Sequence, residues 1–342
     1  MPANQVRTAL LVGLGRSPVR LPLVAADVDI MIPAYGDGPL LRETVQSVLA
    51  QTDRDWQLAV IDDAASLEDG SLPAWLWSLD DSRMRYLANP KRLGINRNFQ
   101  RCADESRADW VIVLGADDRL LPDCLARVRA VISDFGKASW IHSGATIIDN
   151  DGRPSLPMAD RVKRRSAPKV RGRRLMAGED LAVSLLRGNW MYLPSCVFRR
   201  DVLLHHGFRP GHDIVLDLDL YLRILLSGGS CVLLERPGIE YRRHSASLSS
   251  TGADNGTRFA EENAYFHEMA AVMTRAGWPR AASAARRHWT SRMHTAVKVP
   301  SLIAARRHRA AAAMVRLAFN PAGPRSSMPI SGASSNDTLG SD

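Results

Sequence analysis

Acidic pairs follow two apolar runs in the first half of the sequence. Asp62-Asp63 comes directly after the run at 57–61, and Asp117-Asp118 follows the run at 110–114. Aspartate is also a common turn and helix-cap residue, so one pair alone predicts little. Two pairs at the ends of separate strands indicate a site. Carboxylates gathered at one edge are suited to holding a divalent cation.

The segment 27–135 supplies the elements that position these acids. Short apolar runs predict strands at 28–32, 57–61, 84–88 and 110–114, and helical spacing predicts helices from Pro39, near Ile95 and from Pro122. Repeated strand–helix–strand units are typical of an α/β fold with a doubly wound, mainly parallel sheet. Such sheets bind ligands beyond the carboxyl ends of their strands, so both acidic pairs are expected at one rim.

The alternation loosens after residue 136. We expect a strand at 139–148, a basic mobile loop at 152–174, a helix at 178–187, a strand at 195–198, a helix at 216–227, and strands at 231–235 and 239–243. From 258 onward the sequence is rich in Ala and Arg and predicts helices broken at Pro279 and Pro300. The Pro/Gly/Ser-rich tail from about 320 is expected to be disordered.

Composition and charge exclude several classes of protein. The chain has 342 residues and a net charge of +9, with no apolar run long enough to span a bilayer. Residues 258–325 carry twelve Arg/Lys against three Glu, and residues 153–174 carry nine against one Asp, so the remainder is net acidic. An acidic body with two basic segments argues against a uniformly basic nucleic-acid binder. The basic C-terminal helices predict either contact with an anionic membrane or a helical cover over the sheet.

Cysteine spacing and the N-terminus point to a cytoplasmic protein. The four cysteines are far apart and include no C-x-x-C pair, which excludes a zinc ribbon and favours free thiols in a reducing compartment. Arg16 interrupts the apolar stretch near the N-terminus, so residues 1–26 are interpreted as an extension rather than a signal peptide.

Several of these runs together resemble a known family. The runs are DIMIPAYGDGPLLRETVQSVLAQT, LAVIDDAAS, NPKRLGINRNFQRC and WVIVLGADDRLLPD, followed by NWMYLPSCVFRRDVL, DLDLYLRILLSGG and YRRHSASLS. Their order and spacing resemble the inverting family 2 glycosyltransferases, which have the GT-A fold, over residues 27–250. The resemblance implies a domain at 27–255, with a nucleotide-sugar half at 27–135 and an acceptor half at 136–255. It leaves an N-terminal extension at 1–26, a basic helical region at 256–320 and a tail at 321–342.

The resemblance implies a metal site at the second acidic pair. In the family a D-x-D motif binds a cation, Mn²⁺ or Mg²⁺, that offsets charge on the leaving nucleoside diphosphate. Here Gly115 replaces the first Asp, Asp117 is retained as the implied metal ligand, and Asp118 adjoins it. His244 is a second candidate ligand for the metal or the diphosphate. The alternative is that Asp117 and Asp118 only cap the following turn.

The resemblance also implies donor-binding and acceptor-binding residues. The donor would contact Pro33, Ala34, Tyr35, Asp62, Asn98, Ala116, Asp117 and Asp118. Asp62 would accept a hydrogen bond from the base, and Pro33, Ala34 and Tyr35 would form one wall of the nucleoside pocket. The acceptor would contact Trp190, Tyr192 and Ser195, although Trp190 is as well suited to a core.

A general base is required for an inverting transfer, and two acids compete for this role. Asp217 occupies the base position of the run resembling the family's E-D motif, with Leu216 in place of the Glu. Asp219 would point about 200° away on the same helix, so only one of the two can face the cleft. The register with Arg223 favours Asp217.

The sequence therefore predicts an inverting glycosyltransferase of cell-surface polysaccharide biosynthesis. It would use a nucleotide sugar, with a UDP-sugar favoured, and a glycan or lipid-linked acceptor, in the cytoplasm or peripherally at the inner face of the plasma membrane. Three alternatives compete: a non-catalytic sugar-nucleotide or membrane-binding protein, a sugar nucleotidyltransferase, which would need a Gly-rich G-x-G-T-R loop absent here, and a nucleic-acid binder. No nucleic-acid partner is expected.

Overall fold

The computed structural model describes residues 27–65, 70–243, 257–288 and Val315. The expected N-terminal extension, the C-terminal tail, the break at Pro300 and His244 lie outside these residues. The described chain forms two compact units, one of residues 27–185 and 189–243 and the other of residues 186–188 and 257–288.

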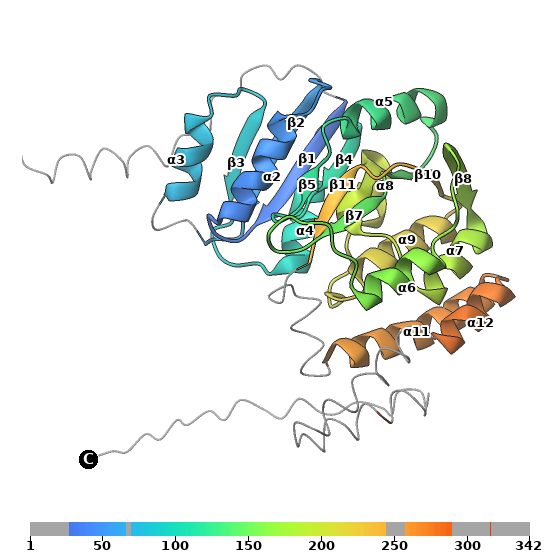
Figure 1. Ribbon diagram of the computed structural model, residues 1–342. Helices are drawn as coiled ribbons and strands as arrows, with labels where there is room; N and C mark the ends of the chain where they lie inside the picture. The colour runs from blue at the N-terminus through green and yellow to red at the C-terminus, as the bar shows by residue number, and fades with distance from the viewer. Residues whose placement is uncertain (1–26, 66–69, 244–256, 289–314, 316–342) are drawn as a thin grey trace, which may run out of the picture. The chain divides into compact units, whose positions relative to one another are not determined.

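An eight-stranded mixed sheet forms the centre of the first unit (Figure 1). Its order is β3-β2-β1-β4-β9-β6-β10-β8, and β1 pairs in parallel with both β2 and β4. The strands are β1 (Val28–Ala34), β2 (Trp56–Asp62), β3 (Met84–Ala88), β4 (Trp110–Val113), β6 (Trp140–His142), β8 (Arg173–Ala177), β9 (Cys196–Arg199) and β10 (Ser230–Leu234). Strands β8 and β9 run antiparallel to their neighbours, whereas the other pairs of this sheet are parallel. The expected α/β fold with a mainly parallel sheet is therefore confirmed.

Helices cover both faces of this sheet because its central strands are apolar on both sides. One face packs against α2 (Pro39–Leu49), α3 (Ser71–Ser78) and α5 (Cys124–Phe135), whose side chains share one core with Ile30, Leu58 and Ile112. Helix α4 (Ile95–Glu105) contacts β1, β2 and β4 and buries Cys102. The remaining helices are α6 (Met158–Ser166), α8 (Arg200–His206), α9 (Leu216–Leu226) and α7 (Gly178–Arg187), of which α7 belongs to this unit up to Leu185.

A small second sheet has the order β5-β11-β7. Its strands are β5 (Arg119–Leu120), β7 (Ala145–Ile148) and β11 (Ile239–Arg242). This sheet corrects the prediction of one strand at 139–148. Gly144 adopts φ +73°, a left-handed conformation that favours glycine, and the chain leaves the large sheet there.

The basic stretch 152–174 is also different from the prediction. It contains helix α6 and the start of β8 rather than one loop. Clustered Arg and Lys suggested solvation, but both residues are good helix formers. A smaller correction concerns Pro122, which lies two residues before α5 rather than in its first turn, and whose carbonyl oxygen accepts the Thr52 N–H at 2.9 Å.

The second unit contains α11 (Thr257–Arg275) and α12 (Pro279–Arg287), which pack against each other. The helical region is interrupted just before Pro279, where α12 begins, as expected. No helix within the described ranges is both long and apolar enough to cross a membrane.

Candidate functional site

The carboxyl ends of β1, β2 and β4 lie at one edge of the large sheet. Ala34 pairs with Asp62, and the Leu114 N–H donates to the Met31 carbonyl oxygen at 2.9 Å. The turn that follows β4 therefore begins beside the ends of β1 and β2. This confirms the expectation that both acidic pairs lie at a common rim.

Asp62 is fully buried at the end of β2. Its Oδ2 accepts a hydrogen bond from the Tyr86 hydroxyl at 2.9 Å, and its Oδ1 accepts one from the Ala65 N–H at 3.2 Å. Tyr35 is 61% exposed, with the Arg92 guanidinium 4.4 Å from its ring centre. Tyr35 is therefore the accessible aromatic surface at this rim.

The other predicted contacts of the nucleoside wall differ in exposure. Pro33 is half-buried, whereas Ala34 is buried in β1. Asn98 is buried on α4, where its Oδ1 accepts from Asn89 at 3.0 Å and its Nδ2 donates to the Ile61 carbonyl oxygen at 3.2 Å. The Asn98 side chain thus ties α4 to the end of β2.

Asp63 fixes the loop before α4, a role that the sequence analysis did not assign. Its carboxylate accepts hydrogen bonds from the Asn89 side chain at 2.8 Å and from the Leu93 and Gly94 N–H groups at 2.7 and 2.9 Å. An Asp after a buried strand and an Asn in the next loop were the available signal, but their pairing is set by the tertiary structure.

The turn after β4 folds two carboxylates over Gly115. A Cβ placed on Gly115 would lie 2.5 Å from Asp118 Oδ2 and 3.0 Å from Asp117 Oδ1. Asp118 is only 1% exposed, whereas Asp117 and Ala116 are half-buried. Burial and the charge of Asp117 raise the pKa of Asp118 well above its ordinary value.

A buried arginine holds this turn in place. Arg242 of β11 is 2% exposed, and its Nε donates to the Asp117 carbonyl oxygen at 2.9 Å. Its Nη1 donates to the carbonyl oxygens of Asp149 and Asn150 at 3.2 and 2.8 Å, and its Nη2 pairs with Glu43 at 2.7 Å. One side chain therefore joins the turn after β4, the end of β7 and helix α2.

The donor set at this turn fits a divalent cation that arrives with a diphosphate. Such a cation needs few protein carboxylates because phosphate oxygens and water complete its shell. Asp117 supplies a partly accessible carboxylate beside a second one held over Gly115. The described ranges contain no group of three His, Cys, Asp or Glu side chains placed to hold a metal. The predicted ligand His244 lies outside them.

The two acids of α9 have different surroundings. Asp219 is fully buried, and its Oδ2 accepts from Arg223 Nε at 2.8 Å while Arg209 lies 3.5 Å from its Oδ1. Asp217 is half-buried, and its Oδ2 accepts from Asn189 Nδ2 at 2.9 Å. Burial raises the pKa of Asp217, against the opposing effects of the Lys163 charge and the Asn189 hydrogen bond.

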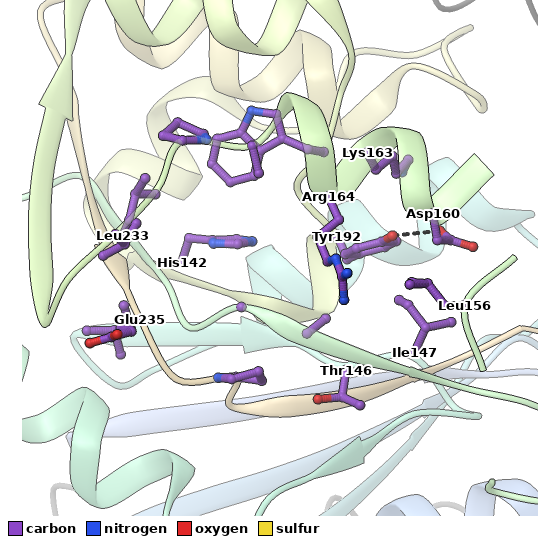
Figure 2. Close-up of a pocket in the computed structure, with 18 of the residues that line it drawn as sticks. His142, Thr146, Ile147, Leu156, Asp160, Lys163, Arg164, Tyr192, Leu233 and Glu235 are labelled. Carbon is purple, nitrogen blue, oxygen red and sulfur yellow. Dashed lines mark hydrogen bonds between the residues drawn. The ribbon is translucent and has the colours of Figure 1, made fainter. Parts of the chain in front are cut away.

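A cavity of about 610 Å³ opens beneath α6 (Figure 2). Two of the predicted acceptor residues, Trp190 and Tyr192, line it, together with His142 of β6. Ser195 is buried outside the lining, and its hydroxyl donates to the Tyr192 carbonyl oxygen at 2.7 Å. Figure 2 shows His142 pointing across the cavity toward Tyr192 and Arg164. Burial lowers the pKa of His142 to about 3, so this ring is neutral.

Helix α6 is fastened to the cavity wall through Asp160. The Tyr192 hydroxyl donates to Asp160 Oδ1 at 2.6 Å, and Arg243 Nη2 donates to the same atom at 2.8 Å. The Lys163 ammonium lies 4.4 Å from the centre of the Tyr192 ring. Burial opposes ionisation of Asp160, but the hydrogen bonds and charges outweigh it and lower its pKa. The sequence analysis missed Asp160 and Lys163 because it expected a loop there.

Comparisons with known proteins agree with this architecture. Residues 29–202 match the model of Glycosyl transferase family 2. The chain is 27% identical over 230 residues to the uncharacterized protein MT1568 of Mycobacterium tuberculosis, covering 66% of this chain and 69% of that one. It is 24% identical to the succinoglycan biosynthesis protein ExoO of Rhizobium meliloti, covering 65% of this chain and 62% of ExoO.

Two solved structures share the fold at low sequence identity. TarS of S. aureus in complex with UDP-GlcNAc superposes with a TM-score of 0.54 at 11% identity, covering 71% of this chain and 66% of TarS. The mannosyltransferase PcManGT of Pyrobaculum calidifontis, in complex with GDP-Man and Mn²⁺, gives a TM-score of 0.51 at 14% identity, covering 93% and 88%.

Proposed function

The chain belongs to glycosyl transferase family 2, and from this premise we propose that it is an inverting transferase that moves a sugar from a nucleotide-sugar donor to a glycan or lipid-linked acceptor. The polysaccharide role of ExoO and the nucleotide sugars bound to TarS and PcManGT support this proposal. Residues 27–135 would bind the donor and residues 136–255 the acceptor. The extension at 1–26, the helical region at 256–320 and the tail at 321–342 have no assigned step.

The donor would lie at the rim formed by β1, β2 and the turn after β4. Tyr35 would cover the nucleoside, with Pro33 beside it, and buried Asp62 would lie behind the edge of the base. Ala34, Asn98, Ala116 and Asp118 would shape this rim. A UDP-sugar is the favoured donor.

The difference between Asp217 and Asp219 is the observation that carries the mechanism. Asp219 forms ion pairs with two arginines, whereas Asp217 is partly accessible and has a pKa raised by burial. A base with a raised pKa is better matched to proton transfer near neutral pH. We therefore assign Asp217 as the general base.

Atoms and charges balance in the proposed transfer. Asp217 accepts the proton of the acceptor hydroxyl, and the hydroxyl oxygen forms a bond to the anomeric carbon from the side opposite the leaving group. The bond from that carbon to the diphosphate oxygen breaks, and the nucleoside diphosphate leaves with the electron pair. A divalent cation, Mn²⁺ or Mg²⁺, held at Asp117 would offset the charge on that diphosphate.

The cavity beneath α6 is the proposed acceptor site. Its walls combine apolar side chains with the aromatic faces of Trp190 and Tyr192, and aromatic rings are suited to stacking on sugars. The Lys163 charge acts on Asp217, which connects the cavity to the base. The proposed location is the cytoplasm, because all four cysteines are free and buried.

Hydrolysis of a panel of nucleotide sugars, with and without Mn²⁺, tests the donor half of this proposal. We expect slow release of one nucleoside diphosphate that requires the metal and is lost in Asp117→Ala. The matched control is Asp109→Ala, which removes an exposed carboxylate just before β4, at the opposite end of that strand from the turn. Absence of both hydrolysis and metal-dependent nucleotide binding would favour a non-catalytic protein of the same fold.

A further inference from the structure

Helix α6 presents two stripes of side chains with different surroundings. Asp160, Lys163, Arg164 and Ala167 all line the cavity. The other stripe consists of Met158, Arg161, Val162 and Arg165, all exposed. Each stripe follows the i, i+3, i+4, i+7 spacing of one helix face. The inner stripe belongs to the acceptor site already described, and the outer one has no assigned role.

The outer stripe exposes apolar side chains to solvent, although a helix face in contact with water is typically polar. Met158 is 72% exposed and Val162 is 36% exposed, one turn apart. Adjacent exposed apolar side chains rimmed by charged residues are typical of an interaction surface.

Cations surround these apolar side chains. Residues 158–176 contain eight Arg/Lys and one Asp, and that Asp160 is buried. Arg173 pairs with Asp134. Within the described part of the chain, no salt bridge is formed by Arg161, Arg164, Arg165, Lys169, Arg171 or Arg174. Most of the segment's cations therefore form no salt bridge with the described residues.

We propose that the outer stripe of α6, with the cations that follow it in sequence, docks on an anionic phospholipid bilayer. Arginine and lysine side chains would reach the lipid phosphates while Met158 and Val162 enter the headgroup boundary, which is the pattern of peripheral membrane helices. A duplex nucleic acid would also attract the cations, but it offers no apolar layer for these aliphatic side chains. The observations thus favour the bilayer.

This docking surface adds a consequence for the cavity. Arg164 lines the cavity and is also exposed, so it lies between the inner and outer stripes. A bilayer against the outer stripe would bring the cavity close to the headgroups, where an acceptor carrying a lipid phosphate would be found. The membrane proposal stands independently of the proposed transfer, since it is tested without donor or acceptor.

Vesicle pelleting of the full chain tests the proposal. The probes are phosphatidylcholine vesicles with and without about a third of phosphatidylglycerol. We expect binding to the anionic vesicles that weakens with salt. The double variant Arg161→Ser/Arg165→Ser should weaken it by about tenfold or more, because each cation near the surface contributes substantially. The matched control is Arg286→Ser/Arg287→Ser, which removes two exposed arginines from the last turn of α12.

Three further measurements distinguish a bilayer surface from a nucleic-acid surface and from a folding defect: vesicle binding of an apolar variant, melting temperature and competition by duplex DNA. Met158→Ser/Val162→Ser should weaken vesicle binding at high salt, where electrostatic attraction is screened. An unchanged melting temperature would show that each variant is folded. Equal loss in the α12 control, no loss in the α6 arginine variant, or no vesicle binding by the wild-type chain would each overturn the proposal. Displacement by duplex DNA, together with no effect of the Met158/Val162 variant, would overturn it in favour of a nucleic-acid surface.

Discussion

The backbone N–H of Arg242 donates a 2.9 Å hydrogen bond to Asp118 Oδ1, joining positions 124 residues apart. This bond turns the other carboxylate oxygen of Asp118 over Gly115, 2.5 Å from the place a Cβ would occupy. The space in which the first Asp of a D-x-D motif would begin is therefore filled. This turn requires a glycine at position 115 for steric reasons, and the replacement of the motif's first Asp is therefore more than the absence of one carboxylate.

Restoring the family motif should consequently harm the site. Gly115→Asp is expected to weaken Mn²⁺-dependent UDP binding, because its Cβ displaces Asp118 and crowds Asp117. Gly115→Ala should destabilise the fold by about 1–3 kcal/mol through overpacking. Calorimetric titration and thermal unfolding measure the two effects. Gly38→Ala is the stability control, because a Cβ there meets nothing within 4 Å. Tighter nucleotide binding by Gly115→Asp would contradict this account.

Arg242 should be irreplaceable by lysine. A lysine ammonium cannot span the three carbonyl oxygens and the Glu43 carboxylate that the guanidinium joins. Each buried acceptor left unsatisfied costs about 1–3 kcal/mol, so Arg242→Lys should lower the urea midpoint markedly. Glu43→Gln removes only a partly exposed partner and should cost less than about 1 kcal/mol. Similar losses in both variants would argue against a central role for Arg242.

The two acids of α9 should separate activity from stability. Asp217→Asn is expected to lower the transfer rate by a factor of about 10²–10⁴ while leaving the fold intact. Asp219→Asn weakens a buried ion pair and should lower the free energy of unfolding by up to about 3–5 kcal/mol. Paired measurement of transfer kinetics and urea unfolding distinguishes the two. Full transfer activity in Asp217→Asn would exclude this residue as the base.

Much of the donor half was predictable from sequence because its elements are local. The apolar runs at 28–32, 57–61, 84–88 and 110–114 match β1 to β4 to within two residues at each end. For β1, β2 and β4 the reason is that short runs covered on both faces leave little ambiguity. The acidic pairs follow those strands directly. Their common edge was therefore predictable from the rule for parallel sheets.

The acceptor half was less predictable because tertiary contacts determine it. The run 139–148 is apolar throughout, and only the left-handed Gly144 divides it between two sheets. In α6, Asp160 is buried by Tyr192 and Arg243, partners that are distant in sequence. Asp217 and Asp219 were indistinguishable by spacing, and the arginines around Asp219 separate them.

The raised pKa of Asp217 predicts a specific pH dependence. Burial favours the neutral acid in the folded state, so this group's contribution to stability is present at low pH and is lost as pH rises through the raised pKa. Asp217→Asn, which is neutral at every pH, should therefore be at least as stable as wild type at pH 7 and equal to it below about pH 4. The acidic limb of the transfer rate should lie above the ordinary range of Asp, because the base must be ionised. A limb below about pH 4 would contradict the assignment.

Two tyrosines offer a matched test of the division between donor and acceptor halves. Tyr192 donates to buried Asp160 at 2.6 Å beside the cavity, and Tyr86 donates to buried Asp62 at 2.9 Å beside the donor rim. Each Tyr→Phe change removes one hydroxyl-to-carboxylate hydrogen bond and should cost about 1–3 kcal/mol of stability. Tyr192→Phe is expected to raise KM for the acceptor severalfold and to leave donor hydrolysis unchanged, because it loosens α6. Tyr86→Phe should raise KM for the donor instead. The same kinetic change in both variants would mean that the two halves do not bind their substrates separately.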